Sequence, residues 1–267
     1  MQRIGLIAGN GRFPILFAQE ARKNQTQVIS VGIKHDTSGI LKNYVDKFYL
    51  VDVRNFEEIF NIFQKENIKK VVMAGQVSPG NLFKKSVIND PRIVTLFNRI
   101  KNCKADTIFG ALADMLKEKN LELIDSTTFL KDYLPKKGVL TERSPTKDEW
   151  EDIELGFQAA KAIGHLDIGQ VVCVKQKSIV AVEAIEGTDN TIKRSARFAG
   201  PGVVVVKVSK PNQDMRFDIP VVGLRTIENL IKTKASCLAI EAEKTLVLDK
   251  EKAIELANKS NVCIIVV

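Results

Sequence analysis

The sequence is poor in cysteine and histidine, and this limits the chemistry it can carry. Its four cysteines are widely scattered and form no C-x-x-C pair: Cys103, Cys173, Cys237 and Cys263. That spacing argues against a zinc site or a disulfide framework and predicts a cytoplasmic protein. With only His35 and His165 available, proton transfer or metal ligation is expected to fall to carboxylates.

Long hydrophobic runs and aromatic clusters are also missing. No stretch approaches the ~18 apolar residues that a membrane span needs, and the first apolar run is too short for a signal-peptide core. Aromatic residues make up 6% of the chain and are not interleaved with a basic stripe, so a nucleic-acid partner is not expected. The net charge of +8 favours anionic partners, such as phosphorylated ligands, nucleic acid or an acidic membrane surface, and does not by itself choose among them.

The 267 residues are enough for two domains, and the first half predicts a Rossmann-like unit. Residues 2–8 are expected to form a buried strand, the turn Gly9-Asn10-Gly11 follows it, and residues 13–23 have the periodicity of a helix. The amides of such a turn suit a phosphate, although a tight left-handed turn would have the same sequence. Further strands are predicted at 28–33, 47–53 and 68–74. The last of them ends in a turn over 75–80 that begins with Gly75 and Gln76, and we expect this turn and the first one to lie beyond the carboxyl ends of parallel strands, where ligands bind. Asp106 precedes a helix, which it could also cap.

The fold class expected is α/β, with two domains. An N-terminal Rossmann-like parallel-sheet domain is predicted over 1–130, a linker rich in proline and charge over 131–147, and a C-terminal α/β domain with a mixed sheet over 148–267.

The stretch from Lys210 to Gly223 alternates in a way that predicts an extended strand. Asp214, Arg216 and Asp218 would share one face, and apolar side chains the other. A salt-bridge ladder on an edge strand would show the same alternation.

A second acidic stretch is predicted at a strand end of the same domain, with basic residues after it. Such carboxylates could hold Mg²⁺ together with substrate phosphates, and the Gly-Thr-Asp run could equally be a capped helix start. Its candidate residues are Glu183, Glu186, Gly187, Thr188 and Asp189.

Several long motifs resemble those of the LpxI-type UDP-2,3-diacylglucosamine pyrophosphatases. They are Ile4-Gly-Leu-Ile-Ala-Gly-Asn-Gly-Arg-Phe-Pro14, Val71-Val-Met-Ala-Gly-Gln-Val77, Leu166-Asp-Ile-Gly-Gln170, Val182-Glu-Ala-Ile-Glu-Gly-Thr-Asp189 and Lys210–Gly223. The resemblance implies a two-domain, dimeric hydrolase of lipid A biosynthesis, cytoplasmic or peripheral at the inner membrane. It also implies hydrolysis of UDP-2,3-diacylglucosamine, with Mg²⁺ or another divalent metal, to UMP and 2,3-diacylglucosamine 1-phosphate (lipid X).

The resemblance also assigns residue roles. It makes Asp218 the catalytic aspartate and adds Arg216 and Asp214; Asp218, Glu183 and Asp189 become the candidate metal ligands. The expected substrate-binding residues are Gly9, Asn10, Gly11, Gly75, Gln76, Asp106, Gln170, Glu186, Gly187, Thr188, Lys210 and Gln213.

Two departures from the family pattern affect this assignment. Lys104-Ala-Asp-Thr107 replaces Gly-Asp-Asp-Ala, so a role for the acid before Asp106 cannot be transferred. The first turn has Asn10 in place of a third glycine. The alternative functions are a nucleotide-binding oxidoreductase and a non-catalytic nucleotide-binding protein.

Overall fold

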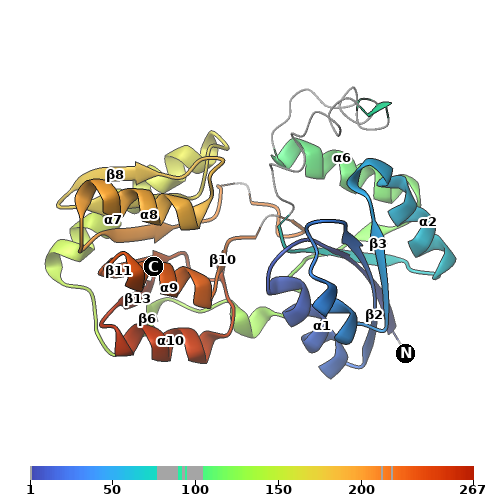
Figure 1. Cartoon of the computed structure of the whole chain (residues 1–267), viewed down its shortest axis with the longest axis horizontal. Helices are drawn as coiled ribbons and strands as arrows, with labels where there is room; N and C mark the ends of the chain where they lie inside the picture. Colours follow the sequence, from blue (N-terminus) through green and yellow to red (C-terminus); the bar gives the residue numbers. More distant parts are fainter. Residues whose placement is uncertain (1, 77–89, 92–93, 95–104, 212, 218) are drawn as a thin grey trace. The chain divides into compact units, whose positions relative to one another are not determined.

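A computed structural model describes residues 2–76, 90–91, 94, 105–211, 213–217 and 219–267. By their contacts the residues form two compact units. Unit 1 comprises Met1–Lys131 together with Asp214–Asp218, and unit 2 comprises Asp132–Gln213 and Ile219–Val267. The chain therefore leaves unit 2 after Gln213, contributes a short segment to unit 1, and returns at Ile219 (Figure 1). The prediction placed Asp214–Asp218 in the C-terminal domain of 148–267, whereas by its contacts this segment belongs to unit 1.

Unit 1 is a parallel five-stranded sheet with helices, as predicted. Its strand order is β3-β2-β1-β4-β5, so the direction of strand addition reverses between β1 and β4. Its elements are β1 (Gln2–Ala8), α1 (Phe13–Lys23), β2 (Thr26–Ile33), η1 (Gly39–Asn43), β3 (Lys47–Val51), η2 (Val53–Asn55), α2 (Glu57–Lys65), β4 (Lys70–Ala74), α6 (Ala105–Glu118) and β5 (Glu122–Leu123).

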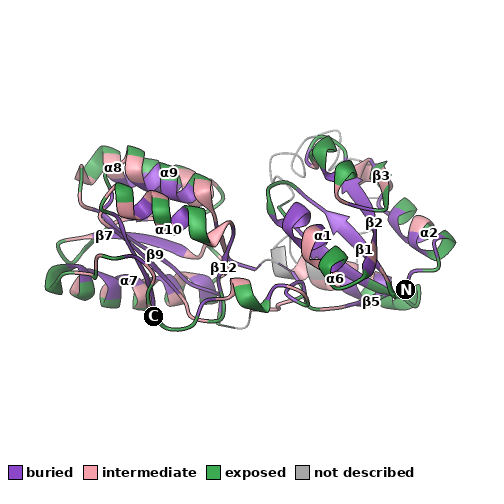
Figure 2. Ribbon diagram, turned by 90° about the horizontal axis from the view of Figure 1, so that it is seen from below, coloured by how far each residue is buried: buried purple, intermediate pink, exposed green. Residues whose placement is uncertain are grey.

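Burial on both faces explains why the central strands of unit 1 read as continuous apolar runs. In β1, the five consecutive residues from Ile4 to Ala8 are buried. Helix α2 turns Ile59, Phe60 and Phe63 toward the sheet (Figure 2). A Cβ on Gly5 would lie 2.9 Å from the Phe63 ring, so the missing side chain allows helix and strand to approach closely.

Unit 2 is built on a mixed six-stranded sheet of order β6-β13-β11-β9-β7-β8, which also agrees with the prediction. Strands β9, β11 and β13 are parallel, and β6, β7 and β8 run antiparallel to their neighbours. After η3 (Lys131–Tyr133), at the boundary of the units, the elements are β6 (Gly138–Val139), α7 (Lys147–His165), β7 (Val171–Lys175), β8 (Ser178–Val182), α8 (Thr188–Ala199), β9 (Val204–Lys207), β10 (Val221–Val222), α9 (Leu224–Lys232), β11 (Cys237–Ile240), β12 (Leu246–Val247), α10 (Lys250–Lys259) and β13 (Cys263–Val266).

Both faces of this sheet are covered. Helix α7 packs on one face, where a Cβ on Gly156 would lie only 2.6 Å from Val206 Cγ2. Helices α8, α9 and α10 contribute to the core on the other face (Figure 2). The hairpin of β7 and β8 turns at Gln176 and Lys177, which both have positive φ, and the Asp152 carboxylate accepts hydrogen bonds from both amides. Such a turn matches the twist of the paired strands.

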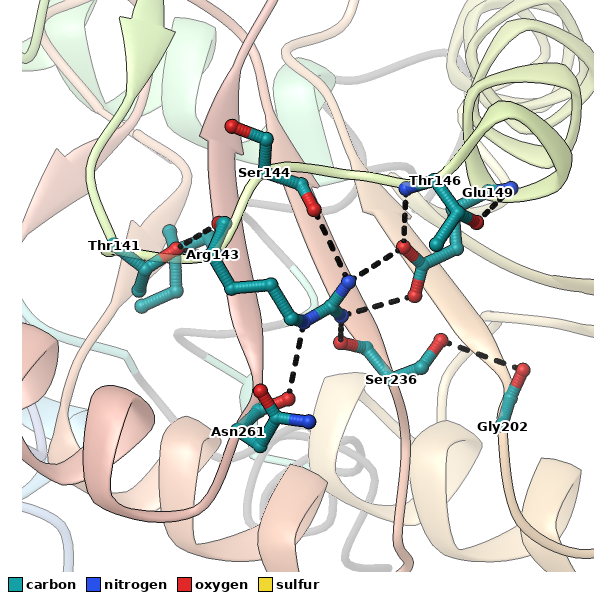
Figure 3. Close-up of polar contacts among 9 residues, drawn as sticks. Thr141, Arg143, Ser144, Thr146, Glu149, Gly202, Ser236 and Asn261 are labelled. Carbon is teal, nitrogen blue, oxygen red and sulfur yellow. Dashed lines mark hydrogen bonds and ion pairs between the residues drawn. The ribbon is translucent and has the colours of Figure 1, made fainter.

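The interval 131–147, expected to be a linker, is bound to unit 2 over much of its length. Strand β6 pairs with β13, and Arg143 bonds to several segments at the amino-terminal ends of the parallel strands (Figure 3). Its guanidinium donates to both Glu149 carboxylate oxygens at 2.8 and 3.0 Å, and to the carbonyls of Ser144, Ser236 and Asn261. Because Arg143 has five N–H donors, these contacts use its full capacity.

None of the helices in the described ranges is long and apolar enough to cross a membrane. Three of the cysteines, Cys173, Cys237 and Cys263, are free thiols buried in the unit 2 sheet; Cys103 lies outside the described residues.

Candidate functional site

In unit 1, the two glycine turns meet at the point where the strand order reverses. Gly9 N donates to Ala74 O at 2.8 Å, Asn10 N to Gln76 O at 2.7 Å, and Gln76 N to Asn10 O at 3.2 Å. The loops after β1 and β4 are therefore joined by main-chain hydrogen bonds beyond the carboxyl ends of both strands. This is the place where open parallel sheets bind ligands.

Close packing explains the glycines at this contact. Gly75 has a φ of +88°, and a Cβ there would lie 2.5 Å from Asn10 O; a Cβ on Gly9 would lie 2.6 Å from Gln76 O. Asn10, Gly11, Gly75 and Gln76 are nevertheless exposed. The predicted turn residues from Val77 to Gly80 lie outside the described residues. What is described is a solvent-facing main-chain edge next to the start of α1, of the kind that accommodates a phosphate.

The stretch around Arg216 is a turn, so the predicted extended strand is wrong. Phe217 N donates to Asp214 O at 3.1 Å, and Arg216 N donates to Asp214 Oδ1 at 3.0 Å. An aspartate that bonds to the main chain two residues on stabilises a turn in competition with a strand. Arg216 is exposed and Phe217 is buried, whereas Asp214 and Met215 are both of intermediate burial, so the predicted alternation in burial holds only for the last pair.

Arg216 and Asp214 form an ion pair on the surface of this turn. Arg216 Nε lies 3.0 Å from both carboxylate oxygens of Asp214, and Nη2 lies 2.6 Å from Oδ2. The hydrogen bonds from Arg216 lower the pKa of Asp214, and Asp214 in turn raises the pKa of Arg216. Both groups are therefore charged at neutral pH.

The turn is anchored to unit 1 through Ser126 and Phe217. Ser126 N donates to Met215 O at 3.0 Å, and Ser126 Oγ lies 2.7 Å from both Met73 O and Arg216 O. Phe217 is 6% exposed and belongs to the core of unit 1. The predicted placement of the two acidic stretches in one domain is therefore wrong, because long-range contacts hold Asp214–Asp218 against the other sheet.

Two residues of the predicted site cannot be placed. Asp218 lies outside the described residues. Asp106 lies in the first turn of α6, and its side chain is likewise outside the described part.

In unit 2, the carboxyl ends of the parallel strands carry a charged cluster. Glu183 is 8% exposed and accepts hydrogen bonds from Gln170 N at 2.9 Å and Thr188 Oγ1 at 2.8 Å. Lys207, the last residue of β9, places Nζ 3.2 Å from Thr188 Oγ1 and 2.8 Å from Val221 O. The predicted residues Gln170, Glu183 and Thr188 are thus brought together, and Lys207 joins them.

Neighbouring predicted residues are held in ion pairs. Helix α8 begins at Thr188 after Gly187, whose φ of 78° suits glycine. Glu186 Oε1 lies 2.5 Å from Arg194 Nη2, and Asp189 Oδ2 lies 2.7 Å from Arg225 Nε. Both carboxylates therefore already have an arginine partner.

Lys210 is a buried cation rather than an exposed one. Its Nζ lies 2.6 Å from Asp167 Oδ1, and the two side chains are 8% and 13% exposed. The Gln213 side chain accepts a hydrogen bond from Lys210 N at 3.2 Å, which closes the loop before the chain leaves unit 2. A second pair, Lys161 with Glu241, lies 2.6 Å apart, and Ser209 also bonds to Glu241.

Ser126, Asp167 and Lys207 were not among the predicted site residues. A lysine ending the run Val203–Val206 was a usable signal for Lys207, and Asp167 stands inside a motif already singled out. Ser126 had no local signal beyond a hydroxyl after a strand, because its partners are 53 and 90 residues away.

The predicted metal set was Asp218, Glu183 and Asp189. In the ranges that the structure describes, no three His, Cys, Asp or Glu side chains gather in a way that could hold a metal ion. Glu183 and Asp189 already accept hydrogen bonds or ion pairs from other groups, so the described donors do not by themselves make up a divalent site.

Comparison with known families bears on both units. The model of the LpxI N-terminal domain matches residues 3–133, and that of the LpxI C-terminal domain matches residues 136–265. The chain belongs to the LpxI family. The UDP-2,3-diacylglucosamine pyrophosphatase LpxI of Caulobacter vibrioides is 27% identical over 269 residues, covering 97% of this chain and 95% of that protein.

Solved structures resemble this LpxI chain only distantly. The biotin carboxylase subunit of pyruvate carboxylase matches 74% of this chain and 40% of its own, at 11% identity and a TM-score of 0.29. N5-carboxyaminoimidazole ribonucleotide synthetase from Thermotoga maritima matches 71% and 43%, at 15% identity and a TM-score of 0.25. Similarity at this level does not bear on the function of an LpxI protein.

Proposed function

We propose that the chain hydrolyses UDP-2,3-diacylglucosamine to UMP and 2,3-diacylglucosamine 1-phosphate (lipid X), a step of lipid A biosynthesis. The observation that carries the proposal is membership of the LpxI family over both units. The full-length relative from Caulobacter vibrioides is named for this activity.

The main-chain edge of unit 1 supports a pyrophosphate substrate. The exposed turns at Gly9–Gly11 and Gly75–Gln76 lie at the strand-order reversal, beside the start of α1. Gly9 N, Asn10 N and Gln76 N already donate to main-chain carbonyls, so the feature that favours anionic oxygens there is the start of α1, the positive end of its helix dipole. We assign the phosphate groups to this edge.

In the proposed reaction, water attacks the phosphorus nearer the sugar. A new P–O bond forms to the water oxygen, the bond to the bridging oxygen breaks, and UMP leaves with that oxygen. Asp218 is the proposed group that orients the water. Arg216 offsets charge that develops on the phosphates. Asp214 engages the Nε–Nη2 side of its guanidinium, and the Nη1 side is chemically suited to phosphate.

Several residues of unit 2 are also proposed to bind substrate. Gln170, Glu186, Gly187, Thr188 and Gln213 are the proposed contacts. Lys210 has a supporting role, because its ammonium is buried against Asp167.

A divalent cation is part of the proposal. Mg²⁺ is the first choice, and the candidate ligands are Asp218, Glu183 and Asp189. Such an ion would neutralise phosphate charge and lower the pKa of a bound water. We also propose a homodimer, a cytoplasmic location and peripheral contact with the inner membrane.

The test is UMP release by the purified protein from UDP-2,3-diacylglucosamine, with Mg²⁺ or with EDTA. The wild type should release UMP with the metal, EDTA should abolish release, and Asp218→Asn should lower kcat by about a thousandfold or more. Asp148→Asn, an exposed position in the first turn of α7, is the matched control and should behave like wild type.

Each outcome bears on a different part of the proposal. No UMP from the wild type with any divalent metal would refute the function. Full activity in Asp218→Asn would retain the function and refute the assigned residue. Activity unaffected by EDTA would refute the proposed requirement for a metal ion.

A further inference from the structure

Ser126 binds the main chain of two segments that are far apart in the sequence. It is fully buried, it follows β5, and its amide donates to Met215 O at 3.0 Å. Its Oγ lies 2.7 Å from Met73 O, in β4, and 2.7 Å from Arg216 O. A hydroxyl has one proton, so it donates to one of these carbonyls at a time.

The residues around Ser126 hold it in place. Ile124 N donates to Val71 O at 2.9 Å, which continues the pairing of β5 with β4. Asp125 Oδ1 accepts hydrogen bonds from Thr127 N and Thr127 Oγ1, each at 2.6 Å. The loop is therefore fixed on both sides of Ser126 by contacts that do not involve the Asp214–Phe217 turn.

Arg216 is held through its main chain on both sides. Met215 O accepts a hydrogen bond from Ser126 N, and Arg216 O accepts one from Ser126 Oγ. Phe217 packs in the core of unit 1. The Arg216 side chain remains 45% exposed, and its guanidinium has Asp214 as a partner. The position of the charge relative to the carboxyl end of β4 therefore depends on the Ser126 contacts.

We propose that Ser126 is a positioning residue for the reaction: it sets the register of the Asp214–Phe217 turn against β4, and through it the place of Arg216. This inference rests on the proposed function, because Arg216 matters to catalysis only if phosphate chemistry occurs there. Ser126 itself touches no reacting atom in this assignment.

The test compares Ser126→Ala with a matched control. Ser30→Ala removes another fully buried serine hydroxyl of the same sheet, one whose Oγ has no hydrogen-bond partner among the described residues. Ser126→Ala should lower kcat about tenfold to a hundredfold and leave KM within about threefold, since binding groups elsewhere are unchanged. Ser30→Ala should retain both constants.

Hydrogen exchange gives a readout that does not need activity. In Ser126→Ala the amides of Arg216 and Phe217 should exchange at least tenfold faster than in wild type, while those of β2 keep their rates. A kcat within twofold of wild type would overturn the proposal. So would unchanged exchange of the turn, or exchange that rises equally throughout unit 1, which would indicate a general loss of stability.

If Ser126→Ala does not fold, Ser126→Thr and Ser126→Cys replace it. The first retains the hydroxyl and the second substitutes a weaker donor, so kcat should be higher in the threonine variant at matched melting temperature. Equal kcat would overturn the proposal. If the wild type releases no UMP, the proposed function fails and the exchange experiment alone decides whether Ser126 fixes the turn.

Discussion

The carboxyl edges of the two sheets differ in the groups that form them, main chain in unit 1 and side chains in unit 2. In unit 1 the edge is mostly main chain: two glycine turns bond to each other, and the ion pairs Arg216–Asp214 and Arg54–Asp52 are both partly exposed. In unit 2 the edge is made of side chains, with Lys210 and Lys207 buried among carboxyl, hydroxyl and carbonyl oxygens. A main-chain edge tolerates no added atoms, whereas a buried ionic edge tolerates no missing partner.

The largest effect should come from breaking the buried pair of unit 2. Lys210→Met leaves the Asp167 carboxylate buried without its cation, which should cost about 3–5 kcal/mol of unfolding free energy. Trp150, the single tryptophan, lies in α7 of unit 2, so its fluorescence during urea unfolding reports this unit. A loss under 1 kcal/mol would contradict a tightly paired lysine.

Two further variants serve as controls for the stability of Lys210→Met. Lys232→Met removes an exposed lysine 4.0 Å from Glu228 and should change stability by less than about 0.5 kcal/mol. Adding Asp167→Leu to Lys210→Met removes the uncompensated charge and should recover much of the loss.

A smaller effect should follow from adding one carbon to the main-chain edge of unit 1. Gly75→Ala combines a φ of +88° with a Cβ 2.5 Å from Asn10 O, and should destabilise unit 1 by about 2–3 kcal/mol. UMP release should fall at least tenfold, because the two turns would separate. The measurement is thermal unfolding followed by circular dichroism, with the activity assay alongside.

Gly39→Ala is the control for that substitution. A Cβ there meets no described atom within 4 Å, and its backbone is not in the left-handed region. Its stability should stay within about 0.5 kcal/mol of wild type. Equal losses in the two variants would mean that the contact between the turns is unimportant.

The smallest effect should come from acid acting on the exposed pair. Arg216 lowers the pKa of Asp214, so the pair's contribution is full above the ordinary aspartate pKa of 3.8 and is lost as pH falls through the lower folded value. Melting curves of wild type should therefore lose more stability below that pH than those of Asp214→Asn, by a few tenths of a kcal/mol, given solvent screening. A difference above 2 kcal/mol would show that the pair behaves as a buried one.

Local patterns predicted the elements of unit 1 well. The first strand, its glycine turn and the helix over 13–23 were confirmed, because strong apolar runs and the turn residues are read from neighbours in sequence. The pairing of Asn10 with Gln76 was expected only in outline, since parallel-sheet topology brings the two strand ends together.

The wrong predictions, an extended strand at Asp214–Asp218 and its placement in the C-terminal domain, have one physical origin. Asp-Met-Arg-Phe-Asp has the period of a strand, but the Asp214 carboxylate bonds to Arg216 N and favours a turn. Which sheet receives that turn depends on Ser126 and on the core around Phe217, and neither is visible within a short window of sequence.

The insertion of Asp214–Asp218 into unit 1 has a consequence for the order of folding. During synthesis, the first 131 residues leave the ribosome without the aromatic side chain that completes their core. Unit 1 can therefore reach its final packing only after most of unit 2 has been made. A fragment that stops at Lys131 should retain the sheet but lack Phe217, and supplying the missing turn as a peptide should restore cooperative unfolding.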